Sequence, residues 1–80
     1  MEKRSIAIAG HRTSVALEPA FWRALEEIAA RRGVDLPSLI AEIDEARARQ
    51  GAPAGGLASA LRVFALETFR VGLRLGDEAD

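Results

Sequence analysis

The residues from Arg12 to Leu17 alternate between two kinds of side chain, and this short segment constrains the fold more than any other feature. Thr13, Val15 and Leu17 fall on one face of an extended strand, and Arg12, Ser14 and Ala16 fall on the other. A lone strand is unstable in water, because its backbone groups need a second strand and its apolar face needs a cover. The chain must therefore find a partner for this strand.

The segment just before it, residues 5–9, offers at most a small additional piece of strand. Ile6 and Ile8 also alternate, but they share the parity of Arg12 rather than that of Val15. One unbroken strand would therefore place both isoleucines on the polar face. We expect a break at Gly10-His11, where a bulge or a tight turn resets the alternation. No internal repeat is recognised in the chain.

Two amphipathic helices are expected after the strand. The first begins near Pro19, because proline suits the first turn, and ends at Gly33, because glycine suits the left-handed residue that follows a helix. The second follows Asp35, a good N-cap, has Pro37 in its first turn and ends before Gly51. Their apolar stripes are Phe21, Trp22, Leu25, Ile28 and Ala29, and then Leu36, Leu39, Ile40, Ile43 and Ala46.

A third helix is expected over residues 57–75, after a linker of small residues at 51–56. Its apolar residues cover most of its circumference, which indicates partners on more than one side. The predicted organisation is a domain at 1–50, the linker, the C-terminal helix packed on the same domain, and an acidic tail at 76–80. The linker permits this helix to fold back on its own subunit or to cross to another.

A chain of 80 residues supplies only a small core. Hydrophobic residues make up 49% of it, but 16 of them are alanine. Short chains usually add disulfides, a metal or oligomerisation, and this one has no Cys and one His. The simplest solution is a homodimer in which residues 12–17 pair antiparallel with the same segment of a second copy. The expected dimer core is Val15, Leu17, Phe21, Trp22, Leu25, Leu39, Ile40 and Ile43.

A family resemblance is carried by Val15-Ala16-Leu17-Glu18-Pro19, the stripe from Phe21 to Ala29, Gly33, and residues 35–46. In this order they resemble the Arc/MetJ-like ribbon-helix-helix family. The resemblance implies a mainly α fold with one short β-strand, in which an intertwined homodimer forms an intermolecular antiparallel two-stranded ribbon. Residues 10–14, 17–22 and 59–64 are similar to a subgroup of small bacterial proteins with an appended C-terminal helix.

The resemblance also implies a dimer that binds double-stranded DNA and lays its ribbon in the major groove, which admits two strands. Carried over by position, the residues that face the bases are Arg12, Ser14 and Ala16. The family often has a long polar side chain where this chain has Ala16, so we expect a weaker or less selective reader. A plainer interpretation of Arg12 is a solvated residue on an exposed strand.

Phosphate contacts are expected on either side of the ribbon. Lys3, Arg4 and His11 form a basic arm that leads into it. Ser38 lies where the family presents the N-terminus of its second helix to a phosphate. Asp35 works against this last contact, because its carboxylate lies where the phosphate would bind.

The formal net charge of −1 hides an uneven distribution. Residues 1–12 carry Lys3, Arg4 and Arg12 against Glu2, a local charge of +2. The last four residues carry Asp77, Glu78 and Asp80, a local charge of −3. The overall charge therefore does not exclude a DNA-binding head.

A second function also fits the sequence, namely a dimeric protein-interaction module, antitoxin-like or an adaptor, that docks a protein partner through residues 57–75. An enzyme is not expected, because no cluster of titratable side chains accompanies His11, and no cofactor or metal is expected. The expected DNA-binding transcription regulator is bacterial and cytoplasmic, with neither a signal peptide nor a membrane segment.

Overall fold

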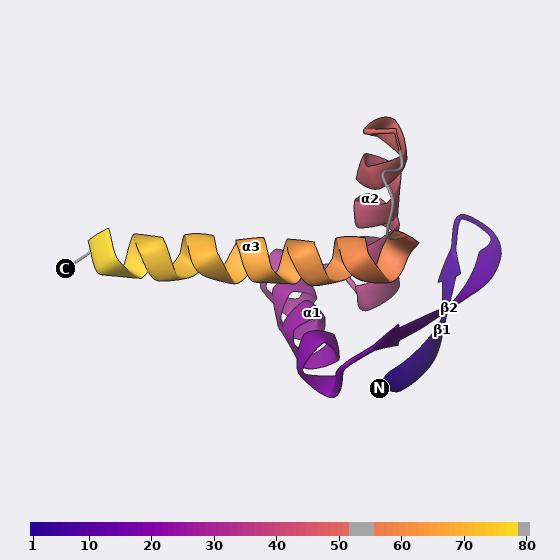
Figure 1. Cartoon of the computed structure of the whole chain (residues 1–80), viewed down its shortest axis with the longest axis horizontal. Coiled ribbons are helices and arrows are strands. Elements are labelled where there is room, and N and C mark those ends of the chain that lie inside the picture. The colour runs from indigo at the N-terminus through magenta and orange to yellow at the C-terminus, as the bar shows by residue number, and fades with distance from the viewer. Residues whose placement is uncertain (52–55, 79–80) are drawn as a thin grey trace.

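The structure, a computed structural model, describes residues 1–51 and 56–78, with side chains described up to Gly72. Its elements are β1 (Glu2–Ile8), β2 (His11–Leu17), α1 (Pro19–Arg32), α2 (Leu36–Arg49) and α3 (Gly56–Glu78) (Figure 1). The molecule measures 44 × 25 × 24 Å, and its long dimension follows α3. Residues 52–55 of the predicted linker and residues 79–80 of the predicted acidic tail lie outside the described residues.

The strands β1 and β2 form an antiparallel hairpin that closes where Ile8 pairs with His11. The two residues between them, Ala9 and Gly10, have φ angles of 50° and 82°. Positive φ at both central residues is the geometry of a type I′ turn, whose twist matches that of the paired strands. The break predicted at Gly10-His11 is therefore present as a tight turn, but it falls one residue earlier, at Ala9-Gly10, and His11 already belongs to β2.

This turn decides which side chains of β1 face the helices. It resets the alternation, so that Ile6 and Ile8 are buried on the same side as Val15 and Leu17. The side chains between them point the other way, because neighbouring residues of a strand alternate between its two faces. The ribbon consequently has an inward face that packs on the helices and an outward face.

The prediction of one short strand paired with a second copy was wrong in its partner. The structure has two strands, and β1 of the same chain pairs with β2 over the whole range from Glu2 to Leu17. The sequence hid most of β1, because Glu2, Lys3 and Arg4 are all charged and show no alternation of polarity. The ribbon-helix-helix fold itself, with its C-terminal helix, is confirmed.

The helices α1 and α2 lie where the sequence predicted them. Pro19 occupies the first turn of α1, and Gly33 ends that helix with a φ of 73°. At α2 the side chain of Asp35 accepts a hydrogen bond of 2.8 Å from the backbone N–H of Ser38, so the predicted N-cap is confirmed. The buried residues of both helices belong to one apolar core with residues of the ribbon and of α3.

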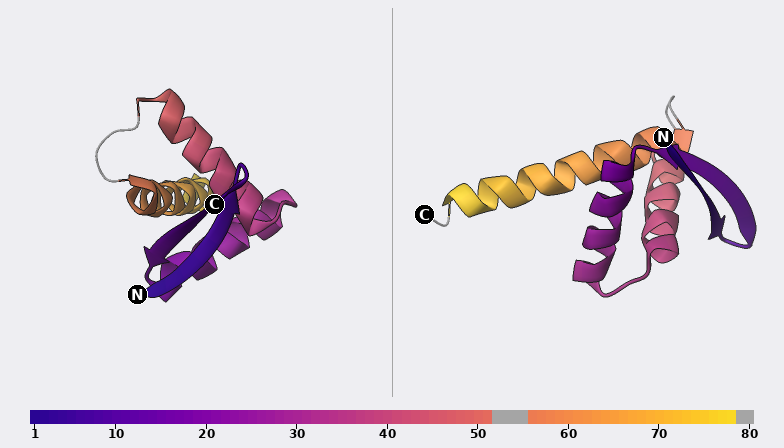
Figure 2. Two further views of the ribbon diagram at one scale, coloured as in Figure 1. Left: turned by 90° about the vertical axis from the view of Figure 1, so that its right-hand side faces the viewer. Right: turned by 90° about the horizontal axis from the view of Figure 1, so that it is seen from below.

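The third helix packs on its own chain, against α1, α2 and β2. It begins one residue before the predicted range of 57–75 and continues to Glu78. Leu61 and Ala65 are buried in these contacts. Arg62 also forms an ion pair of 3.0 Å with Glu18, at the junction of β2 and α1. Figure 2 shows that the C-terminal part of α3 extends past the other helices.

One apolar core joins all these elements inside the single chain. Its buried members are Ile6, Ile8, Val15, Leu17, Trp22, Leu25, Ile28, Ala29, Leu39, Ile40, Ile43, Leu61 and Ala65. Seven of the eight predicted dimer-core residues are among them, and Phe21 packs against them while partly buried. None of the seven exposes more than 9% of its surface. Their contact with a second copy stays a prediction.

Candidate nucleic-acid interface

The outward face of the ribbon consists of three pairs of directly opposite side chains. Lys3 lies opposite Ala16, Ser5 opposite Ser14, and Ala7 opposite Arg12. Five of the six are exposed and Ala16 is half-buried. Opposite side chains on paired strands lie about 5 Å apart, so the six form one surface. The three residues predicted to face the bases, Arg12, Ser14 and Ala16, are brought together there, at the end of the molecule that Figures 1 and 2 show farthest from the C-terminus.

This outward face is positively charged. Of its six residues only Lys3 and Arg12 carry charge, at opposite ends and on different strands. The Nη1 atom of Arg12 lies 3.5 Å from Oγ of Ser5, a long contact that leaves the guanidinium exposed. The nearest carboxylates along the chain have other partners. Glu2 pairs with Arg4, whereas a hydrogen bond from Arg62 holds the pKa of Glu18 below its ordinary value.

Arg4, predicted to belong to a basic arm, lies on the inward side of β1 and has several intramolecular partners. Its guanidinium pairs with Glu2, lies 3.7 Å from the carboxylate of Glu26, and is 4.6 Å from the ring centroid of Trp22. The hydrogen bond to Glu2 is the main cause of the raised pKa of Arg4. These contacts hold the side chain against α1.

The buried side chain of Trp22 also anchors the start of β1. Its indole Nε1–H donates a 2.8 Å hydrogen bond to the backbone oxygen of Glu2, and the side chain is completely buried. A buried indole N–H needs such an acceptor, because leaving it unpaired costs free energy. The sequence assigned Trp22 to the core without this contact, since nothing local to Trp22 indicates a strand 20 residues upstream.

The two remaining predicted phosphate contacts, His11 and Ser38, belong to different elements. His11 is exposed at the tip of the hairpin, beside the turn. Ser38 lies in the first turn of α2, where its backbone N–H already bonds the carboxylate of Asp35. Hydrogen bonds from the side chain and backbone of Ser38 hold the pKa of Asp35 below its ordinary value. The carboxylate of Asp35 thus already accepts the hydrogen bond from the backbone N–H of Ser38 that a phosphate would accept.

Ser5 and Ala7 are outward residues that were not predicted from the sequence, and neither was a short internal repeat that β1 and β2 share. Residues 3–8 read Lys3-Arg4-Ser5-Ile6-Ala7-Ile8, and residues 12–17 read Arg12-Thr13-Ser14-Val15-Ala16-Leu17. In both strands a cation is followed at every second position by Ser and then Ala, and one apolar residue lies between Ser and Ala and another follows Ala. The signal was present at an offset of nine residues, and the expectation of no repeat was wrong.

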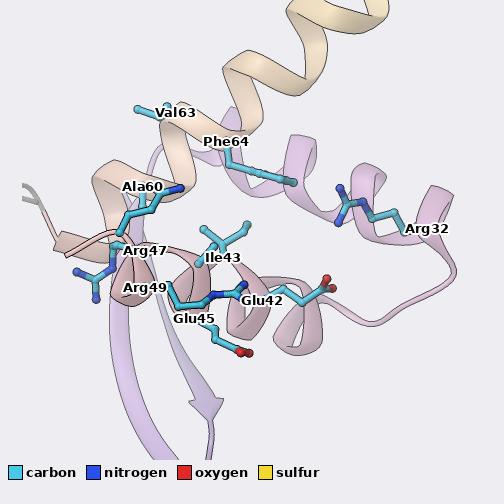
Figure 3. A pocket seen from close by; sticks show the side chains of 11 residues that line it. Arg32, Glu42, Ile43, Glu45, Arg47, Arg49, Ala60, Val63 and Phe64 are labelled. Atoms are coloured by element: carbon cyan, nitrogen blue, oxygen red, sulfur yellow. The ribbon is translucent and has the colours of Figure 1, made fainter. Parts of the chain in front are cut away.

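An open groove of about 650 Å³ lies between α2 and α3, and none of its lining residues belongs to the ribbon. Its apolar part includes Ile43, Val63 and Phe64 (Figure 3). Both acids and bases of α2 line it, namely Glu42, Glu45, Arg47 and Arg49. Mixed charge of this kind does not select an anion or a cation.

Residues 1–51 and 56–78 hold neither a metal-binding cluster nor a membrane-spanning helix. No group of three His, Cys, Asp or Glu side chains there lies close enough together to hold a metal ion. Every helix within those same ranges is too short or too polar to span a membrane.

The fold and this face define a class of protein, namely small α proteins that carry an exposed two-stranded ribbon on a pair of amphipathic helices. The family model of the ribbon-helix-helix domain matches residues 1–69, and the chain belongs to that family. Proteins of the family are typically DNA-binding transcription regulators of a non-enzymatic fold, and they usually bind DNA as dimers.

Comparison with individual proteins adds one solved structure. The chain is similar to an uncharacterized protein from Bordetella pertussis Tohama I, with 41% sequence identity and a TM-score of 0.75. The match covers 94% of this chain and 59% of the Bordetella chain, so this chain spans less than two thirds of its relative's length. No curated protein matches the chain.

Proposed function

We propose that the chain binds double-stranded DNA through the outward face of its ribbon and acts as a small transcription regulator. The observation that carries this proposal is an exposed two-stranded ribbon with two cations, four small side chains and no acid on its outward face. The major groove of B-DNA is about 12 Å wide and admits such a ribbon. The typical function of the family supports the same conclusion.

Arg12, Ser14 and Ala16 are the proposed base contacts from β2. Arg12 can donate two hydrogen bonds to O6 and N7 of guanine, and Ser14 can donate or accept one. Ala16 offers only an apolar contact, for example to the methyl group of thymine. Its short side chain supports the expectation of a less selective reader.

Phosphate contacts are proposed beside these base contacts. His11 is exposed at the tip of the hairpin and is free to approach a phosphate. Arg4 and Ser38 are expected to contribute less, because each already has a carboxylate partner within the chain. The positive outward face makes binding sensitive to salt, because neutralised phosphates release counterions.

Fluorescence anisotropy with duplexes selected from a random library tests the proposal. We expect binding that weakens as NaCl rises, and we expect Arg12→Ala to weaken it roughly five- to hundredfold. Arg23→Ala is the matched control, because it removes the same charge from an exposed position on α1. Failure of every selected duplex to bind, or an equal loss in both variants, would contradict the proposal.

Dimerisation now has a different basis. It was expected because β2 needed a partner strand, and β1 is that partner within the same chain. The homodimer remains a prediction supported by the usual behaviour of the family. A bacterial DNA-binding regulator is expected to act in the cytoplasm, where the chromosome lies.

A protein-interaction module remains the second candidate, because α3 exposes apolar side chains. Val63, Leu66 and Val71 are each more than half exposed, at 56%, 57% and 52%. Exposed apolar groups that lie together often mark protein-binding surfaces. Purifying the untagged protein from its native host tests this function. A stoichiometric protein partner that is lost with Leu66→Lys, with no DNA retained, would favour this function over DNA binding.

A further inference from the structure

The antiparallel pairing relates β1 and β2 by an approximate two-fold rotation. The axis passes between Ser5 and Ser14, perpendicular to the ribbon, and carries each residue of β1 onto the residue nine positions later in β2. On the outward face it matches Lys3 with Arg12, Ser5 with Ser14, and Ala7 with Ala16. On the inward face it matches Ile6 with Val15 and Ile8 with Leu17, and all four are buried. One chain therefore presents a ribbon with two nearly equivalent halves.

The two cations lie at diagonal corners of this ribbon. Lys3 faces Ala16 across the strands and Arg12 faces Ala7, so each long side chain has a short one beside it. The two pairs are separated by four residues, which at about 3.4 Å per residue is about 14 Å. That length corresponds to about four base pairs of B-DNA. The diagonal arrangement directs the two cations to opposite strands of a duplex whose own two-fold axis coincides with that of the ribbon.

We propose that a single chain reads a quasi-palindromic DNA site, with Lys3 contacting bases in one half and Arg12 in the other. This inference rests on the proposed DNA-binding function. In an intermolecular ribbon, Arg12 would come once from each copy; here Lys3 of β1 takes the place of the second Arg12. The two halves differ in their selectivity for guanine. The guanidinium of Arg12 forms a planar fork that matches the guanine edge, whereas the ammonium of Lys3 is a compact point charge.

The competing role for Lys3 is the phosphate arm predicted from the sequence. The two roles differ in what substitution does to specificity. Loss of a phosphate contact weakens binding to all sequences nearly equally, whereas loss of a base contact relaxes preference at one position. The base preference of each half-site is therefore the readout that separates them.

Selection from a random duplex library with the full-length protein, followed by anisotropy on the selected duplexes, tests this inference. Wild type is expected to select guanines about four base pairs apart on opposite strands. Lys3→Ala should relax preference in one half only, and Arg12→Ala in the other half only. Lys3→Arg should make the halves equivalent and raise affinity for a fully symmetric duplex about fivefold or more. Arg23→Ala, again the control, should change neither half.

The outcomes separate this inference from the proposed function. Suppose that wild type binds selected duplexes, but Lys3→Ala weakens binding to all sequences equally or has no more effect than Arg23→Ala. The inference that Lys3 contacts bases in one half of the site is then overturned, and the proposed DNA-binding function stands. If no duplex binds to wild type, the proposed function is overturned, and this inference with it. Far-UV circular dichroism checks that each variant is folded. Lys3→Arg is a second control, because it retains the positive charge at this position.

Discussion

The strands β1 and β2 present nearly the same side chains but are held in place by different means. β2 leads into α1 through Glu18 and Pro19, so the chain itself fixes its position. β1 is connected to β2 by the turn at Ala9-Gly10 and pairs with it along its length, and its far end contacts Trp22 of α1. The position of β2 is therefore set by its direct connection to α1, whereas that of β1 depends on strand pairing and on side-chain packing. Substitutions that loosen the packing should affect β1 first.

The largest expected effect comes from removing the anchor of β1. Trp22→Ala deletes a completely buried ring and should lower the free energy of unfolding by about 3–5 kcal/mol. Urea denaturation followed by far-UV circular dichroism measures this loss. Trp22→Phe keeps most of the ring and removes the hydrogen bond to Glu2, so its cost should be smaller, with about 1 kcal/mol from the hydrogen bond. Equal costs for the two variants would show that the ring does not anchor the strand.

Two equivalent core positions, one in each strand, test whether β1 and β2 are held in place differently. Ile6 and Val15 are equivalent under the two-fold rotation, and both are buried. Ile6→Ala should cost about 2–4 kcal/mol. We expect hydrogen exchange to show that β1 amides lose protection in this variant while α1 and α2 keep theirs. In Val15→Ala the loss should extend into α1, which follows β2 directly. If both variants lose amide protection in the same segments, β1 and β2 are held in the same way, which would contradict the expected difference.

The turn that joins the strands offers a stabilising change. Ala9 has a φ of 50°, a left-handed conformation that costs an L-residue about 1 kcal/mol and a glycine almost nothing. Ala9→Gly should therefore raise the free energy of unfolding by up to about 1 kcal/mol, with the cost of the more flexible unfolded chain set against it. Ala9→Val is the opposite control and should destabilise the hairpin. A loss of stability in both variants would show that Ala9 does not have the left-handed conformation in this turn.

The smallest effect concerns pH. The pKa values of Glu18 and Asp35 are lowered below 4.5 and 3.8, by hydrogen bonds from Arg62 and Ser38 respectively. A lowered folded-state pKa means that the folded chain binds fewer protons, so this stabilisation is complete above those ordinary values and is lost as pH falls through the lower folded ones. Urea midpoints should therefore decline below about pH 4. The double variant Glu18→Gln with Asp35→Asn should flatten this decline, and an unchanged slope would contradict these assignments.

The parts of the fold that follow from local chemistry were predictable from the sequence. Pro19, Gly33 and Asp35 set the helix ends through preferences that act within one turn. The alternation in residues 12–17 gave the two faces of β2, and with them the outward positions of Arg12, Ser14 and Ala16. These features depend on neighbours in the chain, which is why the sequence alone was enough.

The other half of the ribbon was not predictable in the same way, because it depends on pairing. Lys3 and Ser5 share a face with Arg12 and Ser14 only because a two-residue turn sets the register. The inward positions Glu2 and Arg4 carry charge and yet pack toward α1, so polarity gave no sign of a strand there. The small core pointed to a dimer, whereas α3 adds Leu61 and Ala65 to the same core. A monomer of this protein would keep its ribbon.

Both strands of the ribbon belong to one chain, and isotope-filtered nuclear Overhauser measurements test this pairing most directly. Labelled and unlabelled protein are unfolded together, mixed equally and refolded. We expect contacts between Ser5 and Ser14 within labelled chains, and none between labelled and unlabelled chains at this pair of residues. Contacts between β2 strands of different chains, with none between Ser5 and Ser14 of one chain, would contradict it.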